Sequence, residues 1–111
     1  MIRFLAAAMV SALPVAAAAQ SFTPLGTSEI SSTLNGATVL YDSATQRFLS
    51  QGRLLYNNGG ENWGRWKAEE GQYCSQWPPA DGWTCYDVER NGAAIRFTGP
   101  DGRSREGRLA E

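Results

Sequence analysis

Hydrophobic and polar residues alternate in short runs along most of the chain. From Ala37 onward, turn residues separate these runs at intervals of roughly eight to twelve positions, which is typical of an antiparallel β domain. Tyr86 and Val88 share one face of a predicted strand, and Ile95 and Phe97 share one face of the next. These two strands therefore predict a hairpin with one apolar face and one solvated face.

The turn residues divide this region into strands that we expect near residues 37–42, 46–56, 62–68, 72–77, 84–90, 93–98 and 104–110. Gly52 is interpreted as a bend or bulge inside the second strand, and Asn91-Gly92 as a two-residue hairpin turn. Every connection is too short for a parallel crossover, so a meander is the simplest topology. We predict an all-β fold, a small antiparallel meander that forms a barrel or half-barrel of about seven strands.

A short helical pattern precedes the strands. Thr27 or Ser28 can cap a helix, Ile30 and Leu34 lie four positions apart on one face, and Gly36 can end the turn. So short a helix is not stable in isolation, so Ile30 and Leu34 must pack onto other elements. We expect this helical turn to close one open end of the barrel.

The first residues of the 111-residue chain have the layout of a signal peptide. Arg3 precedes an apolar run from Phe4 to Val10, and small residues end at Ala19, after which we place the cleavage. Pro14 interrupts the run, which is too short to span a bilayer, and no later stretch could span one. We expect a signal peptide over 1–19, a single β domain over 20–111, and a periplasmic or secreted mature chain without a membrane span.

The amino-acid composition limits which partners, metals and cofactors the chain can bind. Ten Lys and Arg balance eleven Asp and Glu, so we expect no nucleic-acid partner. The two cysteines, Cys74 and Cys85, form an even count in an exported chain and predict one disulfide. A zinc site would need further soft ligands, but the chain has no His and no third Cys. We therefore expect no metal and no cofactor.

Aromatic residues concentrate around the predicted disulfide, with all four Trp between positions 63 and 83. Trp66 shares its strand face with small residues and is expected in the core. Trp77 and Trp83 flank a Pro-rich loop, where they either pack the loop or form an exposed recognition surface. We take Trp63, Trp77, Trp83 and Asp81 as candidate binding residues.

Catalytic groups are scarce. Without His, a Ser or Cys nucleophile lacks its usual base, and both Cys are assigned to the bridge. A carboxylate pair near the Trp residues would suit a glycosidase, but Asp81 has the context of a turn, and Asp87 and Glu89 alternate outward on a strand. We expect no enzyme activity and no catalytic residue.

Three arginines, Arg103, Arg105 and Arg108, mark the last predicted strand. We interpret them as the charges that protect an edge strand from pairing with another chain. The alternative is a patch that binds phosphate or an anionic glycan.

Four short motifs resemble a family of small exported proteins of unknown function from Gram-negative bacteria. The motifs are Leu34-x-Gly36-x-Thr38, Gly64-x-Trp66, Gly71-x-Tyr73-Cys74 with Trp77, and Cys85-Tyr86-x-Val88. The resemblance covers residues 34–90 and implies a lipocalin-like or half-barrel β domain with no established activity. Ala68 departs from the family, in which an apolar strand residue follows the G-x-W motif.

These observations predict a non-enzymatic exported protein that binds a ligand or partner through the barrel mouth and the aromatic loop at residues 77–83. The expected partner is an unknown small ligand or an envelope protein. The alternative is a proteinaceous inhibitor of an envelope hydrolase, such as a lysozyme, that uses the same loop as a plug.

Overall fold

A computed structural model describes residues 21–111, so the predicted signal peptide lies outside the described residues. One short helix accompanies the strands, which agrees with the predicted mostly β fold. The elements are β1 (Thr23–Pro24), α1 (Thr27–Leu34), β2 (Thr38–Tyr41), β3 (Ala44–Leu49), a 3₁₀ turn (Ser50–Gly52), β4 (Arg53–Asn57), β5 (Glu61–Glu69), β6 (Gln72–Gln76), β7 (Thr84–Asn91), β8 (Ala94–Thr98) and β9 (Ser104–Leu109).

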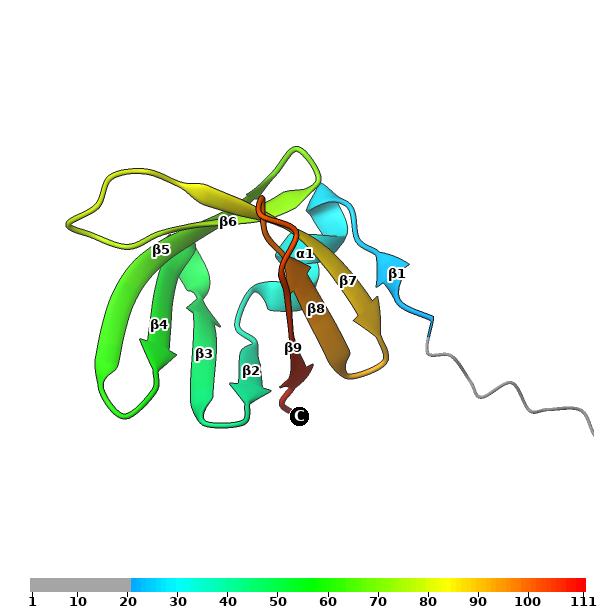
Figure 1. Cartoon of the computed structure of the whole chain (residues 1–111), viewed down its shortest axis with the longest axis horizontal. Coiled ribbons are helices and arrows are strands. Elements are labelled where there is room, and N and C mark those ends of the chain that lie inside the picture. The colour runs from blue at the N-terminus through cyan, green and yellow to red at the C-terminus, as the bar shows by residue number, and fades with distance from the viewer. Residues whose placement is uncertain (1–20) are drawn as a thin grey trace, which may run out of the picture.

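The strands β2 to β9 form a closed antiparallel barrel (Figure 1). Each strand pairs with the next in sequence, and β9 pairs back with β2 through Val39 opposite Leu109 and Leu40 opposite Arg108. β1 pairs with β7 on the edge that β7 also uses to pair with β6, and Thr23 lies opposite Arg90. The predicted antiparallel meander is confirmed, and closure leaves β9 paired on both sides.

The prediction of a single strand over residues 46–56 is wrong. Two antiparallel strands, β3 and β4, occupy this region, and Phe48 pairs with Leu54 across them. The chain reverses at the 3₁₀ turn, where Gln51 has φ 64° and Gly52 has φ 74°. Gly52 thus belongs to a turn and not to a bulge, which raises the number of strands in the barrel to eight.

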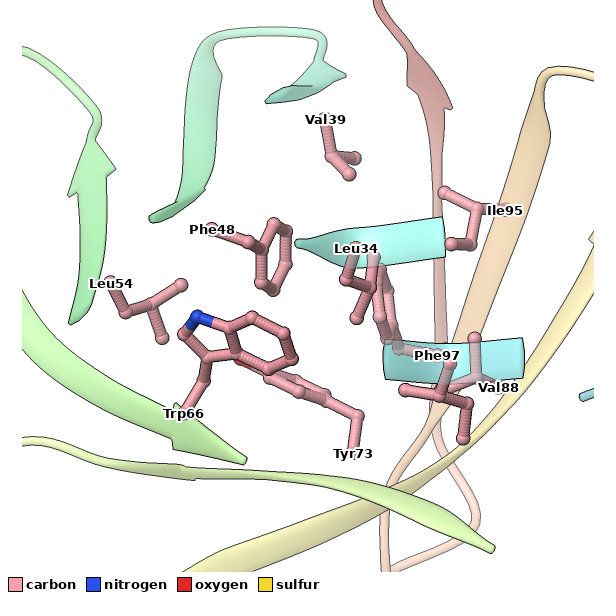
Figure 2. Close-up of a cluster of buried hydrophobic side chains, with 10 residues drawn as sticks. Leu34, Val39, Phe48, Leu54, Trp66, Tyr73, Val88, Ile95 and Phe97 are labelled. Atoms are coloured by element: carbon pink, nitrogen blue, oxygen red, sulfur yellow. The ribbon is translucent and has the colours of Figure 1, made fainter. Parts of the chain in front are cut away.

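Helix α1 closes one end of the barrel. Its two predicted contact residues, Ile30 and Leu34, are fully buried, and Figure 2 shows Leu34 beside the inward side chains of the strands. Gly26, rather than Thr27 or Ser28, is the N-cap, and its backbone N–H donates to Glu29 Oε1 at 2.8 Å. Thr27 Oγ1 instead accepts from the backbone N–H of the turn between β5 and β6, which fixes the helix to this end.

The core centres on Phe48, which is fully buried (Figure 2). Its ring meets Trp66 edge-on at 5.6 Å and Tyr73 edge-on at 5.5 Å. Trp66 is 7% exposed and donates from Nε1 to the Leu49 carbonyl at 3.0 Å, which confirms its predicted place in the core. The indole therefore fills the barrel interior without leaving its N–H unpaired.

The disulfide joins Cys74 and Cys85, as predicted. The two residues lie directly opposite each other on β6 and β7. Their strands continue into the two ends of the loop at residues 77–83. The bridge therefore lies at the base of this loop.

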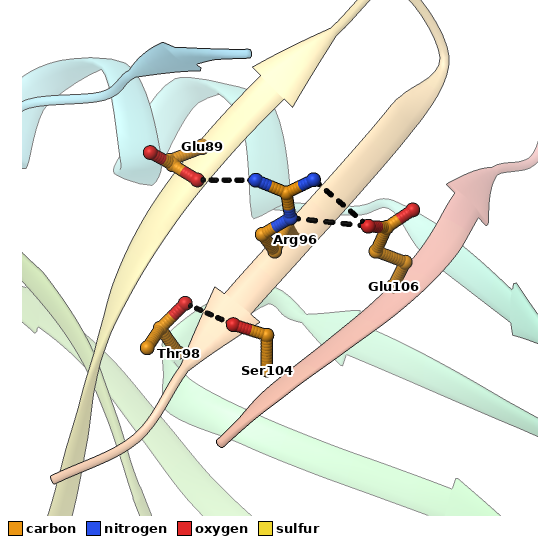
Figure 3. A network of polar contacts seen from close by, with 5 residues as sticks. All are labelled: Glu89, Arg96, Thr98, Ser104 and Glu106. Carbon is orange, nitrogen blue, oxygen red and sulfur yellow. Dashed lines mark hydrogen bonds and ion pairs between the residues drawn. The ribbon is translucent and has the colours of Figure 1, made fainter. Parts of the chain in front are cut away.

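Hydrogen bonds and ion pairs between side chains on the outer face connect β9 to β8, and β8 to β7 (Figure 3). Arg96 on β8 donates to Glu89 at 3.1 Å and to Glu106 at 2.9 Å. Thr98 and Ser104 are joined through their hydroxyls at 2.7 Å. Because residues alternate along a strand, Glu106 on the outer face places its neighbour Arg105 on the inner face.

Candidate functional site

The end of the barrel opposite α1 opens into a cavity of about 600 Å³. Successive turns of a meander alternate between the two ends, so this mouth carries the turns at residues 42–43, 58–60 and 99–103 and the loop at residues 77–83. The cavity is lined by Tyr41, Gln46, Tyr56, Asn62, Tyr73, Ser75, Trp77, Tyr86, Phe97, Arg103, Ser104 and Arg105. We call this cavity the mouth cavity.

All four tyrosines of the chain line the mouth cavity, because each lies at an inward position of its strand. Tyr73 stacks on Tyr86 with the ring centroids 5.5 Å apart. Tyr56 meets Trp77 edge-on at 6.3 Å. Half of the lining residues are therefore aromatic, and the phenol hydroxyls add to the polar groups of the other half.

Glycines on neighbouring segments make room for two of these rings. A Cβ on Gly107 would lie 2.9 Å from the Tyr41 ring and 2.6 Å from Val39. A Cβ on Gly64 would lie 2.7 Å from the Trp77 ring. The rings thus lie directly on backbone, and any larger residue at either glycine would push an aromatic wall into the cavity.

Arg105 contributes a positive charge to the inside of the barrel. Its guanidinium carbon lies 3.7 Å from the centroid of the Tyr41 ring, a cation–π contact. Its Nη2 donates to the Tyr56 hydroxyl at 3.0 Å. Arg103 also lines the mouth cavity, whereas no Asp or Glu of residues 21–111 does.

A hydrogen-bonded chain crosses the floor of the mouth cavity. The Tyr41 hydroxyl donates to Gln46 Oε1 at 3.0 Å, and Gln46 Nε2 donates to the Tyr73 hydroxyl at 3.2 Å. Burial raises the pKa of Tyr41 to about 12, although the nearby Arg105 acts in the opposite direction. Burial also raises the pKa of Tyr73. Both phenols are therefore neutral at ordinary pH and serve as hydrogen-bonding groups, not as bases.

The structure does not bring the candidate binding residues together on one face. Trp77 lines the mouth cavity, whereas Trp63 and Trp83 are 44% and 38% exposed on the outside of the barrel. A cation covers each outer ring, with Arg53 4.6 Å from the Trp63 centroid and Lys67 4.2 Å from that of Trp83.

Asp81 lies in the loop at residues 77–83. Its backbone carbonyl accepts a hydrogen bond from Gln76 Nε2 at 2.9 Å. The residue thus fixes the shape of the loop through its backbone. Its side chain is exposed and does not line the mouth cavity.

The interpretation of the terminal arginines as edge protection is wrong. β9 is not an edge strand, because it pairs with both β8 and β2. Arg105 faces inward and Arg108 outward, so the three arginines do not share one role. Alternation along residues 105, 107 and 109 could have indicated this inward face, with Gly107 and Leu109 on the same side.

Comparison with protein-family models, curated proteins and solved structures found no match to the chain. Within residues 21–111, no three His, Cys, Asp or Glu side chains are grouped as ligands of a metal ion would be. In the same residues, no helix combines the length and the hydropathy needed to cross a lipid bilayer.

Proposed function

We propose that this chain is a non-enzymatic exported protein, periplasmic or secreted, that binds a small ligand in the mouth cavity. The observation that carries the proposal is the cavity itself, whose volume of about 600 Å³ lies within the range of small-molecule sites. Half of its lining residues are aromatic and half are polar, so the cavity offers both apolar surface and convergent hydrogen-bonding groups to a small molecule.

The polar groups of the mouth cavity suit binding better than catalysis. Ser75 and Ser104 are the hydroxyl groups other than phenols, and neither has a basic partner among the residues that line the cavity. The Ser104 hydroxyl instead lies on the outer face, where it shares a hydrogen bond with Thr98. A bound molecule would therefore be held and oriented, with no activated nucleophile beside it.

The loop at residues 77–83 supports the second candidate function, inhibition of an envelope hydrolase. The loop is closed at its base by the disulfide and braced internally by a hydrogen bond from the Ala80 N–H to the Trp77 carbonyl at 3.1 Å. Trp83, at its end, is exposed. A braced loop with an exposed indole could fill the active-site cleft of a hydrolase.

The direct test of the mouth cavity uses N-phenyl-1-naphthylamine, a neutral probe that fluoresces in apolar surroundings. Asn62 lines the mouth cavity and is exposed, so Asn62→Trp would fill the mouth without disturbing the core. Glu61→Trp places the same ring one residue away, on the outer face, and is the matched control. We expect the wild type and Glu61→Trp to bind the probe, and Asn62→Trp to bind it at least about tenfold more weakly.

Two results would overturn the proposal. The first is the absence of probe binding to the folded wild-type chain. The second is equal binding by Asn62→Trp and Glu61→Trp, because the probe would then lie outside the mouth cavity. Inhibition of lysozyme by the wild type that is lost in Trp83→Ala, together with either of these results, would establish the second candidate instead.

A further inference from the structure

The mouth cavity has an unbalanced positive charge. Arg103 and Arg105 line it, and no Asp or Glu in the described part of the chain does. Glu106, the neighbour of Arg105 on β9, faces the outside and accepts hydrogen bonds from Arg96 at 2.9 Å and 3.1 Å. The nearest acid along the strand is therefore already paired on the opposite face, and Arg105 remains without a carboxylate partner among residues 21–111.

Arg103 and Arg105 differ in their surroundings. Arg103 lies at the rim, where its side chain is 89% exposed and its Nε is 3.8 Å from an Asp101 carboxylate oxygen. Arg105 is also exposed, but its guanidinium carbon lies 3.7 Å from the centroid of the Tyr41 ring and 5.4 Å from that of the Tyr56 ring. Two aromatic rings and a hydrogen bond to the Tyr56 hydroxyl hold the Arg105 guanidinium, so this residue is the better candidate for an anion-binding group.

The guanidinium of Arg105 is held in place with donors to spare. Its Cζ atom lies over the Tyr41 ring and its Nη2 donates to the Tyr56 hydroxyl. This is the only hydrogen bond that its side chain donates within the described part of the chain. An arginine carries five N–H donors in a rigid fork that matches the two oxygens of a carboxylate. The remaining donors are available to such a group, and the two tyrosines fix the side chain before a ligand arrives.

Aromatic surfaces surround this charged group. Among the lining residues, Tyr56 and Trp77 meet edge-on, and Tyr86 and Tyr73 stack on each other. Flat apolar groups bind well to such walls, because rings stack or meet edge to face. The mouth cavity thus offers an apolar aromatic enclosure with one oriented cation.

We propose that the ligand of the mouth cavity is a small organic anion with a flat apolar body, whose carboxylate, sulfonate or phosphate group binds Arg105. This proposal rests on the proposed function, because it assigns the ligand class of the same cavity. Arg105 supplies the charge and the hydrogen bonds, and the aromatic walls contact the body of the ligand.

A pair of fluorescent probes tests the ligand class. 8-Anilinonaphthalene-1-sulfonate and N-phenyl-1-naphthylamine share the same aromatic body, and the first carries an added sulfonate. We expect the wild type to bind the sulfonate at least about tenfold more tightly than the neutral probe, as for a charge-assisted hydrogen bond. Arg105→Gln should remove this preference and keep the affinity for the neutral probe.

Arg108→Gln is the matched control, because Arg108 lies three residues away on the same strand and faces outward. It removes the same charge from the chain and should keep the preference for the sulfonate. Arg105→Lys keeps the charge without the fork and should bind the sulfonate with an affinity between those of the wild type and Arg105→Gln. If Arg105→Gln no longer binds the neutral probe, the role of Arg105 is tested by comparing the sulfonate preference of Arg105→Lys with that of the wild type.

The outcomes separate the two proposals. Binding of neither probe to the wild type overturns the proposed function. Equal binding of both probes leaves the proposed function standing and overturns the anionic ligand class. The assignment of Arg105 is also overturned if Arg105→Gln or Arg105→Lys keeps the full preference for the sulfonate. It is overturned as well if Arg108→Gln loses this preference as much as Arg105→Gln does.

Discussion

Gly64 lies under the Trp77 ring, and replacing it by alanine tests how closely the walls of the mouth cavity are packed. The added Cβ would lie 2.7 Å from the Trp77 Cε3 atom and 2.7 Å from the Gln76 carbonyl oxygen. The ring can tilt away, but the carbonyl belongs to β6, which pairs with β5 at Arg65 opposite Gln76. Gly64→Ala should therefore strain the sheet and move Trp77 from its place.

Two opposite effects set the size of the change. Overpacking of this kind costs about 1–3 kcal/mol in the free energy of unfolding. Alanine also reduces the conformational freedom of the unfolded chain, which returns about 0.4–1 kcal/mol. We expect a net loss of about 1–2 kcal/mol, which lowers the urea midpoint by about 1 M for a domain of this size.

Gly60→Ala is the control for this experiment. Gly60 lies in the turn before β5, and a Cβ there would meet no atom within 4 Å. This change should be neutral or stabilising by up to about 1 kcal/mol. Urea unfolding is followed by tryptophan fluorescence for both variants. Repeating Gly64→Ala in a chain that carries Trp77→Ala shows how much of the loss in the free energy of unfolding comes from the Trp77 ring. Equal midpoints for Gly64→Ala and Gly60→Ala would refute the close packing that we describe.

Two further predictions concern stability. Replacing Cys74 and Cys85 together by alanine should lower the free energy of unfolding by about 3 kcal/mol, because the bridge closes a ring over a sequence separation of 11. Thermal melts measure this loss, and an unchanged melt would contradict the prediction. Alkaline pH should also destabilise the fold. The Tyr41 pKa is raised from 10.0 to about 12 in the folded chain, so the phenol loses its proton first in the unfolded chain. About 2 kcal/mol of stability is therefore present below pH 10 and is lost as the pH rises to 12. Tyr41→Phe should flatten this part of the pH profile of urea unfolding, and a profile unchanged in Tyr41→Phe would contradict the assignment.

Local sequence patterns predicted most of the fold. The alternation at Tyr86, Val88, Ile95 and Phe97 placed all four side chains on the inner face, because strand periodicity depends on the backbone alone. The turn at residues 50–52 was missed. Gln51 adopts a positive φ there without the Gly or Asn that usually marks such a turn, so only Gly52 signalled a change of direction.

The candidate site depended on closure of the barrel, which no local pattern reveals. Arg105 looks like an edge charge until β9 is known to pair with β2 as well as β8. The tyrosines are far apart in sequence, on β2, β4, β6 and β7, and meet only because closure of the barrel brings their inward positions to one mouth. Trp77 was selected for its aromatic character, and the same criterion selected Trp63 and Trp83, which lie on the outside.

The indole N–H signals of the four tryptophans give the most direct test of ligand binding in the mouth cavity. They report three places: Trp77 the mouth cavity, Trp66 the core, and Trp63 and Trp83 the outer face. The measurement is a two-dimensional ¹H–¹⁵N spectrum of the folded chain during titration with 8-anilinonaphthalene-1-sulfonate. We expect the Trp77 signal to move while the signals of Trp63 and Trp83 remain in place. Movement of the Trp63 or Trp83 signal with Trp77 unchanged would contradict this expectation.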